Sequence, residues 1–259
     1  MWTGPGALGS LTAVMAAVLA LSVQACDAAD KDTIYSGPIP LGRIWPGPEK
    51  KLYSQGNDEL IIRDFFQDRK NGVFLDVGCS TPIESSTTYY LEKHLGWSGI
   101  GIDALPEHAP AYEKKRPRTK FFNYIVTDHS ETIEEFYRVK GATGLSSTDR
   151  NREWFGRKLQ TDTIKVPTIT LNELLEQNGV TGIDFMSLDI EGGAPKALAG
   201  FDIEKYQPKL ICVEAPAAEE FLKEYFAEHD YERIDKYLKY DFGNWYYTPV
   251  GSDARSAPE

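Results

Sequence analysis

Short apolar runs that alternate with helical patterns constrain the fold of this chain more than any other feature. Residues 73–77 (VFLDV) have the pattern of a buried strand, and helical periodicity follows in residues 86–95 before the next apolar run. The same alternation continues toward the C-terminus. It predicts strands at residues 73–77, 99–104, 120–126, 183–188 and 209–213, with 163–169 as a candidate for a further strand.

The segments around these strands complete the expected architecture. Residues 231–240 and 244–249 are aromatic-rich runs joined by Asp241-Phe242-Gly243, which predicts an antiparallel hairpin. Strands that alternate with helices form a mostly parallel sheet with helices on both faces. The predicted fold class is therefore α/β, a doubly wound, mostly parallel sheet with a C-terminal antiparallel hairpin. The predicted helices are 58–66, 86–95, 109–115, 132–139, 171–178, 195–198 and 218–228.

The first 30 residues have the features of a targeting segment. Residues 1–25 carry no charged side chain, and residues 11–23 form an apolar run of signal-peptide length, which is short for a membrane span. Ala25 and Cys26 suit cleavage by a secretory or lipoprotein peptidase, although the lack of a basic residue before the run leaves a misplaced start or an uncleaved anchor open. We expect an exported or membrane-anchored protein, with membrane association through residues 1–28, if this signal is genuine, and a cytoplasmic protein otherwise.

The remaining boundaries follow from Pro and Gly placement. Residues 31–57 carry these residues at intervals that no helix or central strand accepts, which predicts an extended arm. Residues 58–250 then form one domain, and residues 251–259 a disordered tail. Within the domain, residues 141–160 have no clean period, and an irregular insert of that length is usually functional or mobile.

Composition excludes several classes of protein. The chain has 39 Asp and Glu residues against 28 Lys and Arg residues, a net charge of −11, which is the wrong sign for a protein held mainly by nucleic-acid phosphates. Its three cysteines, Cys26, Cys79 and Cys212, are widely spaced and odd in number. They predict neither a disulfide framework nor a zinc cluster.

An acidic residue lies at or near the carboxyl end of each predicted strand of the parallel sheet. In such sheets ligands bind outside the carboxyl ends of the strands, at the point where the strand order reverses. Any single acid of this kind is readily explained as a turn or helix-cap residue. The whole set indicates a binding site. Its members are Asp76, Asp103, Asp128, Asp189 with Glu191, and Glu214.

The loop after the first strand distinguishes between cofactor classes. It lacks the G-x-G-x-x-G pattern that lets a backbone approach a dinucleotide pyrophosphate. Asp76 instead precedes Gly78 by two residues, which favours a cationic amino-acid ligand over a pyrophosphate. Asp103, at the end of the second strand, is suited to hydrogen bonding a ribose diol. S-adenosylmethionine combines both chemical features.

The chain resembles a known family, the FkbM-type methyltransferases. The resemblance covers about residues 53–215 and is carried by FLDVGCS, by LEKHLGWSG and by SLDIEGG. It implies a class I, Rossmann-like, S-adenosylmethionine-dependent fold and O-methylation of a sugar or other small-molecule hydroxyl. Pro82 in place of a usual Gly, and Asp103 in place of a frequent Glu, depart from the family pattern. The implied cofactor-binding residues are Asp76, Gly78, Cys79 and Ser80 on the methionine side, Asp103 and Ala104 at the ribose, and Asp128 on the adenine side.

The resemblance also places Asp189 and Glu191 beside the transferred methyl group, where a base would remove the proton of the acceptor hydroxyl. Two acids one residue apart point in different directions, so we expect at most one of them to be the base. Glu191 as a helix cap and a metal held by the pair are the alternatives, and with no third ligand evident we expect no metal. His129 is an alternative base, whereas His94 is expected to pack structurally.

We therefore expect a single methyltransferase domain that uses S-adenosylmethionine and acts on a small-molecule or glycan acceptor. Residues 141–160 and the C-terminal hairpin are the expected specificity elements. Two rival functions remain open. One is a noncatalytic protein that binds the ligand and retains the fold, and the other, disfavoured by the missing glycine pattern, is a nicotinamide-dependent oxidoreductase.

Overall fold

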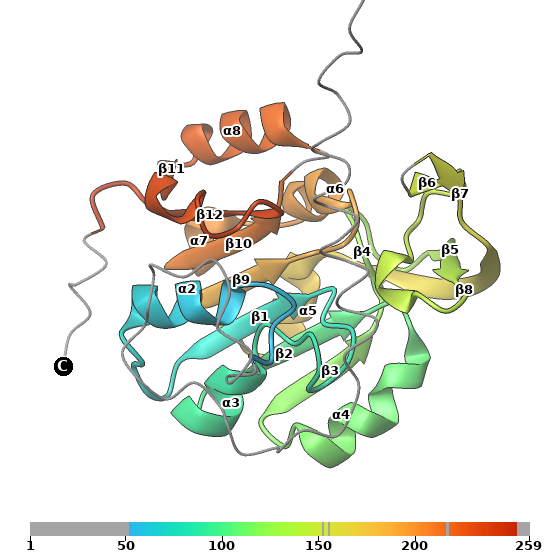
Figure 1. Cartoon of the computed structure of the whole chain (residues 1–259), viewed down its shortest axis with the longest axis horizontal. Coiled ribbons are helices and arrows are strands. Elements are labelled where there is room, and N and C mark those ends of the chain that lie inside the picture. The colour runs from blue at the N-terminus through green and yellow to red at the C-terminus, as the bar shows by residue number, and fades with distance from the viewer. Residues whose placement is uncertain (1–51, 152, 155, 216–217, 253–259) are drawn as a thin grey trace, which may run out of the picture.

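The computed structural model describes residues 52–252 except 152, 155, 216 and 217, and a seven-stranded sheet lies at its centre (Figure 1). The strand order is β11-β12-β10-β9-β1-β2-β3. The five strands from β10 to β3 are parallel, and β12 is antiparallel to both β10 and β11. The bounds are β1 (Val73–Val77), β2 (Ser98–Asp103), β3 (Thr119–Asn123), β9 (Phe185–Leu188), β10 (Leu210–Glu214), β11 (Tyr231–Arg233) and β12 (Asn244–Pro249).

Helices cover both faces of this sheet because successive strand residues point to opposite sides. Leu75 and Val77 of β1 belong to a hydrophobic cluster with α5, α6, α7 and α8. Phe74 points the other way, into a second cluster with α2 and α3. The α/β, doubly wound architecture is thus present. The helices are α2 (Asp58–Phe66), α3 (Tyr89–Leu95), α4 (Ala109–Lys115), α5 (Leu171–Gln177), α6 (Ala194–Ala199), α7 (Ile203–Tyr206) and α8 (Glu219–Glu228), with short 3₁₀ turns η1 (Pro106–His108), η2 (Thr143–Leu145) and η3 (Asp235–Tyr237).

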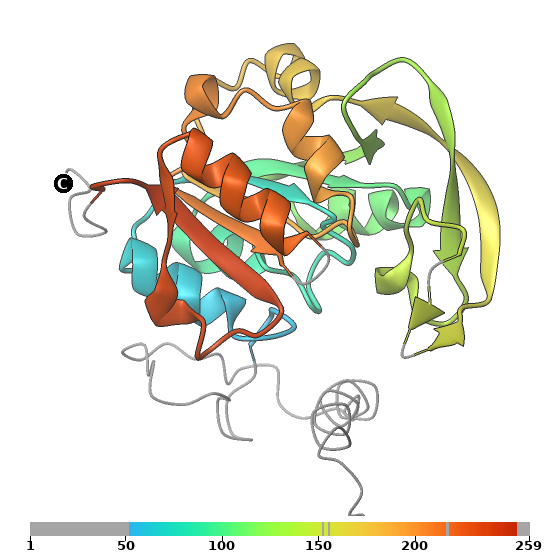
Figure 2. The ribbon, with the colours of Figure 1, turned by 90° about the horizontal axis from the view of Figure 1, so that it is seen from above.

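A second, three-stranded sheet projects from the body beyond β3 (Figure 2). It joins β4 (Ile125–Val126), β8 (Thr161–Ile169) and β5 (Ile133–Val139), and a small pair of strands, β6 (Glu153–Trp154) and β7 (Arg157–Lys158), lies between β5 and β8 in sequence. We call residues 133–169 the arm. The predicted strand at 163–169 is confirmed as most of β8.

The helix predicted at residues 132–139 is wrong. Ile133, Phe136 and Tyr137 fit a helical spacing, but the segment pairs antiparallel with β8 over seven residue pairs. A partner strand more than twenty residues away therefore overrides the local pattern, as is common for β-structure.

The strand predicted at residues 120–126 is divided between two sheets. Its first part belongs to β3, which pairs with β2, and its last two residues form β4, which pairs with β8. Tyr124 lies at the division, where its backbone N–H donates to the carbonyl oxygen of Asp103 at 3.2 Å. The chain leaves the main sheet at this residue. The end of the predicted strand, at residue 126, therefore belongs to the second sheet.

The C-terminal strands pair antiparallel, but they do not form the predicted hairpin. Only Tyr231–Arg233 of the first aromatic run is a strand, and it pairs with residues 247–249. The residues after it turn away to form η3, where the Tyr237 hydroxyl donates to Asp64 of α2 at 2.7 Å. This contact with α2 draws the segment across the face of the sheet, so the connection is long rather than tight.

Several predicted segments lie outside the described residues. These are the targeting segment at 1–30, nearly all of the extended arm at 31–57, and the tail beyond residue 252. Of residues 31–57, positions 52–57 are described, and they form bends that lead into α2. Within the described part of the chain, none of the helices has the length and apolar character needed to cross a membrane.

Candidate active site

The strand order of the main sheet reverses between β1 and β9, which makes the carboxyl ends of these strands the expected ligand position. The backbones that follow them are in direct contact. Asp189 N–H donates to the Val77 carbonyl oxygen at 2.9 Å. Gly78 has a φ of +86°, and a Cβ at this position would lie 1.7 Å from the carbonyl oxygen of Asp189. Only glycine fits here, for both its backbone conformation and its size.

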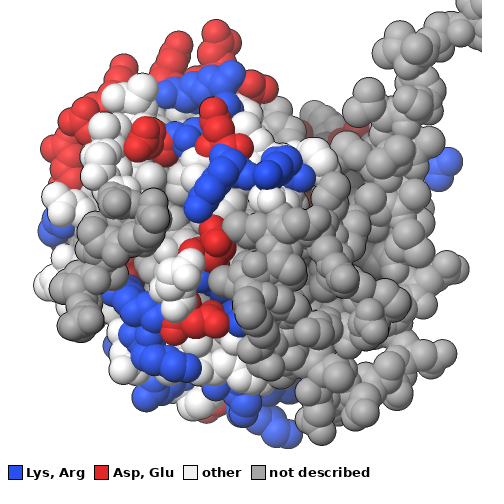
Figure 3. Space-filling model, turned by 60° about the vertical axis from the view of Figure 1, so that its left-hand side comes forward, with Lys and Arg blue, Asp and Glu red and all other residues white. Residues whose placement is uncertain are grey.

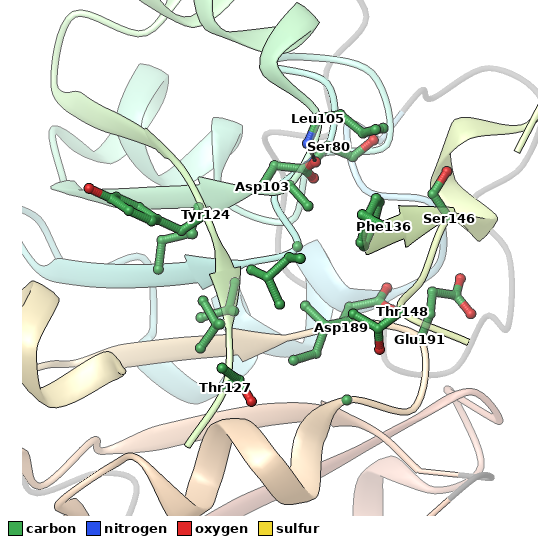
Figure 4. A pocket seen from close by; sticks show the side chains of 18 of the residues that line it. Ser80, Asp103, Leu105, Tyr124, Thr127, Phe136, Ser146, Thr148, Asp189 and Glu191 are labelled. Atoms are coloured by element: carbon green, nitrogen blue, oxygen red, sulfur yellow. Dashed lines mark hydrogen bonds between the residues drawn. The ribbon is translucent and has the colours of Figure 1, made fainter. Parts of the chain in front are cut away.

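A cavity opens at this point between the main sheet and the arm (Figure 4). It contains roughly 780 Å³ of empty space, part of it open to solvent. The main sheet and the loops after its strands form one wall, and residues of the arm form the other. The lining includes Gly78, Ser80, Asp103, Ala104, Leu105, Tyr124, Thr127, Glu134, Phe136, Thr143, Gly144, Ser146, Thr148, Asp189, Glu191 and Lys196.

Asp103 lies at the end of β2 and anchors one side of the cavity. Its Oδ2 accepts the backbone N–H of Ser80 at 2.9 Å, and its Oδ1 accepts that of Leu105 at 2.8 Å. Burial raises the pKa of this carboxyl, although the two backbone N–H groups oppose the shift. Each carboxylate oxygen has a second lone pair for a ligand hydroxyl. Asp103 therefore shapes the loop and still offers acceptors to the cavity.

Asp76 and Cys79 do not line the cavity. Asp76 is buried beneath the loop, and its Oδ2 accepts the Thr88 hydroxyl at 2.6 Å. The Cys79 thiol is also buried, which raises its pKa well above the usual value, and its carbonyl oxygen accepts the Tyr112 hydroxyl at 2.8 Å. These two residues support the loop from behind, whereas Gly78 and Ser80 face the cavity from the same loop.

Asp128 follows β4 rather than a strand of the main sheet, and it is not among the residues that line the cavity. Its exposed carboxylate lies 2.7 Å from Nδ1 of His129, whose Nε2 lies 3.0 Å from Glu134 of the arm. These carboxylates raise the pKa of His129, with the hydrogen bond to Asp128 as the main cause. The neighbouring residues Tyr124 and Thr127 line the cavity instead.

The opposite side of the cavity is acidic. Asp189 and Glu191 follow β9, Glu214 ends β10, and one carboxylate oxygen from each lies within 4.8 Å of the others. This spacing suits general-base chemistry or the binding of a divalent cation. Glu191 has a φ of +54°, a left-handed conformation that is uncommon outside glycine and asparagine and that is found at functional sites.

The sequence identified Glu214 as a strand-end acid but did not place it beside Asp189 and Glu191. Its position there depends on the pairing of β10 with β9, which no local pattern predicts. His94 lies on α3 and stacks against Tyr53 and Tyr90, with its pKa lowered mainly by burial.

The arm contributes the residues that the sequence did not predict for the site. Phe136, Ser146 and Thr148 of the arm line the cavity, and Figure 4 shows Thr148 next to Asp189 and Glu191. Glu134, Thr143 and Gly144 come from the same segment. No local pattern marks these positions, because their placement depends on the long-range pairing of β5 with β8.

Comparisons with known proteins give one family match. Residues 76–243 match the family described as the methyltransferase FkbM domain. Among curated proteins, no relative matches the chain.

Two of the distant likenesses among solved structures are methyltransferases. One is an S-adenosylmethionine (SAM)-dependent methyltransferase from Thiobacillus denitrificans in complex with S-adenosyl-L-homocysteine, at 10% identity and a TM-score of 0.35, covering 72% of this chain and 71% of that chain. The other, from Geobacter sulfurreducens and in complex with the same ligand, has 10% identity, a TM-score of 0.35 and 74% coverage of each chain.

The family match spans well over half of the sequence and includes the loop after β1, the acids after β9 and the end of β10. It also agrees with the resemblance found from FLDVGCS and SLDIEGG. This chain therefore belongs to the FkbM methyltransferase family.

Proposed function

We propose that this chain transfers a methyl group from S-adenosylmethionine to a hydroxyl group of a small molecule or glycan. The observation that carries the proposal is the two-sided cavity at the strand switch point. Asp103 lies on one side of Gly78, and the carboxylates of Asp189 and Glu191 lie on the other. A site of this shape places a bound donor between a ribose-binding group and a proton acceptor.

The residues present fit such a donor. Gly78 lets the loop after β1 lie directly against the Asp189 carbonyl oxygen, where any side chain would clash, and both residues line the cavity. Asp103 supplies acceptors for a ribose diol, and Ala104 and Leu105 supply an apolar surface next to it. When bound, S-adenosylmethionine supplies a methyl group on a sulfonium centre, ready for displacement.

The protein's own contribution is to orient the acceptor and to accept a proton. In-line displacement is promoted mainly by holding the reacting atoms about 3 Å apart in a fixed orientation. The arm and the acidic side enclose the space where an acceptor hydroxyl would lie (Figure 4). Asp189 or Glu191 would then take the hydroxyl proton as general base. A divalent cation held by these two carboxylates and Glu214 is the alternative way to acidify the hydroxyl.

Cofactor titration tests the proposal. Isothermal titration of the purified chain with S-adenosylhomocysteine, and separately with NAD⁺, should give binding of the first ligand alone. Asp103→Ala should weaken that binding by roughly 1.5–3 kcal/mol, the range for hydrogen bonds to a charged group.

The matched control is Glu219→Ala, an exposed acid on α8 paired with Lys223, which should bind as wild type does. Binding of NAD⁺ without S-adenosylhomocysteine would overturn the assignment. Binding without turnover on any hydroxyl acceptor would favour the noncatalytic alternative.

The apolar segment at residues 11–23 supports a further proposal on location. We infer that it directs export or membrane anchoring, because its length and lack of charge match signal peptides. Fractionation of cells that express the full chain and a chain lacking residues 1–30 tests this. The same distribution for both would count against it.

A further inference from the structure

We infer that Arg116 is a positioning residue that holds the loop between β1 and α3 in the shape that receives the methyl donor. This loop, residues 78–88, is called the donor loop below. The inference rests on the proposed function, since it concerns how the donor site is built. Arg116 does not line the cavity itself.

Arg116 lies at the end of α4 and is almost fully buried. Its guanidinium makes two hydrogen bonds to the middle of the donor loop, from Nη1 to the Pro82 carbonyl oxygen at 2.9 Å and to Ser86 Oγ at 3.1 Å. Nη2 donates to Thr88 Oγ1 at 2.9 Å, at the end of the loop. Nε donates to Glu92 of α3 at 2.7 Å. One side chain therefore joins the loop at three points to the helix that follows it.

The start of the donor loop is fixed by the N–H groups of Gly78 and Cys79, which donate to the Ile102 carbonyl oxygen. Its middle and end are held by Arg116, together with the Tyr53 carbonyl oxygen, which accepts the Ser86 N–H.

The donor loop contains no helix or strand, and two of its non-glycine residues, Ser80 and Ser85, have left-handed φ values of +45° and +58°. Conformations of this kind persist only where the surroundings impose them. Ser80 is also the loop residue whose N–H binds Asp103 and whose side chain faces the cavity. The shape of the loop therefore sets the donor side of the site.

The same guanidinium orients the acid behind the loop. Guanidinium groups only donate, so the Thr88 hydroxyl must accept from Arg116 and direct its own proton to Asp76 Oδ2, which lies 2.6 Å away. Burial raises the pKa of Asp76 to about 6, while the Thr88 hydrogen bond and the charge of Arg116 oppose that shift. Arg116 thus connects the loop, α3 and the end of β1 through one hydrogen-bonded chain.

Lysine does not replace this arrangement. A guanidinium presents five N–H groups in a planar fork, whereas an ammonium is a single point with three donors. The acceptors on Pro82, Ser86 and Thr88 surround different edges of the fork. Glu92 also accepts the Arg118 N–H and the Thr119 hydroxyl, so its charge stays supported when the guanidinium is replaced. Arg116→Lys therefore keeps the positive charge but loses the contacts to the loop.

The test compares Arg116→Lys with Arg63→Lys. Arg63 is the matched control, because it is equally buried and its guanidinium pairs with Glu59 of α2 and with Asp68 and lies 4.1 Å from the centre of the Tyr90 ring. We expect Arg116→Lys to bind S-adenosylhomocysteine at least tenfold more weakly than wild type by calorimetry, with faster amide hydrogen exchange in residues 78–88. Arg63→Lys should lower the melting temperature without a change in that affinity. Equal affinity of wild type and Arg116→Lys would overturn the inference.

A second pair of variants covers the case in which Arg116→Lys fails to fold. Thr88→Ser keeps the hydroxyl between Arg116 and Asp76, and Thr88→Val removes it. The serine variant should retain wild-type affinity, and the valine variant should lose it by a similar factor to Arg116→Lys. Equal affinity of the two Thr88 variants would contradict the inference. Should wild type itself fail to bind the ligand, the proposed function falls, and hydrogen exchange in residues 78–88 alone decides whether Arg116 orders the loop.

Discussion

At the residue scale, the carboxylates that follow β9 combine unusual backbone geometry with close mutual spacing. Glu191 adopts a left-handed conformation directly before Gly192, and Glu214 approaches from the neighbouring strand. Glu191 also lines the cavity, which a role as a helix cap alone would not require. The arrangement therefore favours a chemical role for the acids over a purely structural one.

We predict that Asp189→Asn or Glu191→Gln lowers turnover by roughly 10²- to 10⁴-fold, the usual contribution of a general base. The amides keep the size of the side chain but remove the proton acceptor, so affinity for S-adenosylhomocysteine should change little. Steady-state kinetics and calorimetry measure the two effects. A metal role predicts a different result, with loss of activity in Glu214→Gln or with a chelator and recovery on adding a divalent ion. If both single amides keep near-normal turnover without metal dependence, then catalysis rests on positioning alone.

Buried carboxyl groups on α2 and β1 give the protein an unusual pH dependence. Glu59 is almost fully buried, and burial raises its pKa from 4.5 to about 7, opposed by the Tyr53 N–H at 2.9 Å and by the Arg63 charge. Burial likewise raises the pKa of Asp76 to about 6. Each group holds a proton in the folded state at pH values where the unfolded chain has lost it.

Asp58 adds a shift in the same direction. The Tyr246 hydroxyl lies 2.9 Å from Asp58 Oδ1 and 2.8 Å from Asp241 Oδ2. A hydroxyl has one proton to donate, so two ionised carboxylates cannot both be satisfied at it. Burial, together with the nearby Asp241, raises the pKa of Asp58 well above its usual value.

We predict that the free energy of unfolding falls as pH rises from 5 to 7. A raised folded-state pKa gives stability at low pH that is lost as pH rises through the folded value, and Glu59 alone accounts for roughly 2 kcal/mol of this change. Urea unfolding at several pH values measures it. Glu59→Gln should flatten the slope. Asp184→Asn is the control, because the Lys209 and Arg69 hydrogen bonds outweigh burial and lower the pKa of Asp184, which therefore titrates below this window. Stability that rises over this range would contradict the assignment.

At the element scale, the arm forms the second wall of the cavity at the strand ends. Its two long strands pair over seven residue pairs and carry η2 and the following residues to the cavity wall. Three residues of this wall, Thr143, Ser146 and Thr148, carry hydroxyl groups, and Ser146 Oγ accepts the Val139 N–H at 3.0 Å. Hydroxyl groups that both donate and accept suit a polar acceptor.

We predict that Thr148→Val raises KM for the acceptor about 2- to 10-fold, the effect of one lost neutral hydrogen bond, and leaves affinity for S-adenosylhomocysteine unchanged. Valine has nearly the shape of threonine but no hydroxyl group. Initial-rate kinetics at saturating donor measures the effect. Thr163→Val is the control, because Thr163 is an exposed residue of β8 outside the cavity lining. An equal change in donor affinity would show that Thr148 acts on the donor side instead.

At the scale of the whole molecule, the acidic excess is unevenly spread. Figure 3 shows a face on which acidic side chains gather toward the top and Lys and Arg side chains toward the bottom, with both signs mixed between them. The net charge of −11 therefore does not produce a uniform field on this face. Surface charge of this kind affects solubility and association rather than the fold.

We predict that deleting residues 1–30 leaves the melting temperature of the protein unchanged. The segment has the composition of a targeting signal, and the hydrophobic clusters of the described domain already enclose both faces of its sheet. Calorimetric melting of the full and shortened chains checks the prediction. A marked loss of stability on truncation would show that the segment packs against the domain.

The sequence determined the features that depend on local periodicity. The apolar runs at residues 73–77 and 183–188, each followed by Gly or acid, predicted β1, β9 and the ligand edge of the sheet. Asp103 and Gly78 were identified because their chemistry is tied to strand ends. Local patterns carry this information, since a buried strand and an amphipathic helix each impose their own spacing on apolar residues.

Only the tertiary structure decided which strand ends meet. Residues 133–139 form a strand because β8 pairs with them, and this pairing creates the wall that contains Phe136 and Thr148. Asp128 follows a strand of the second sheet and does not line the cavity, and Glu214 lies near Asp189 and Glu191 because β10 pairs with β9. Arg116 acquired its role by burial against a loop some thirty residues earlier. Such contacts join residues far apart in the chain, and their free energy depends on neighbours that no local pattern encodes.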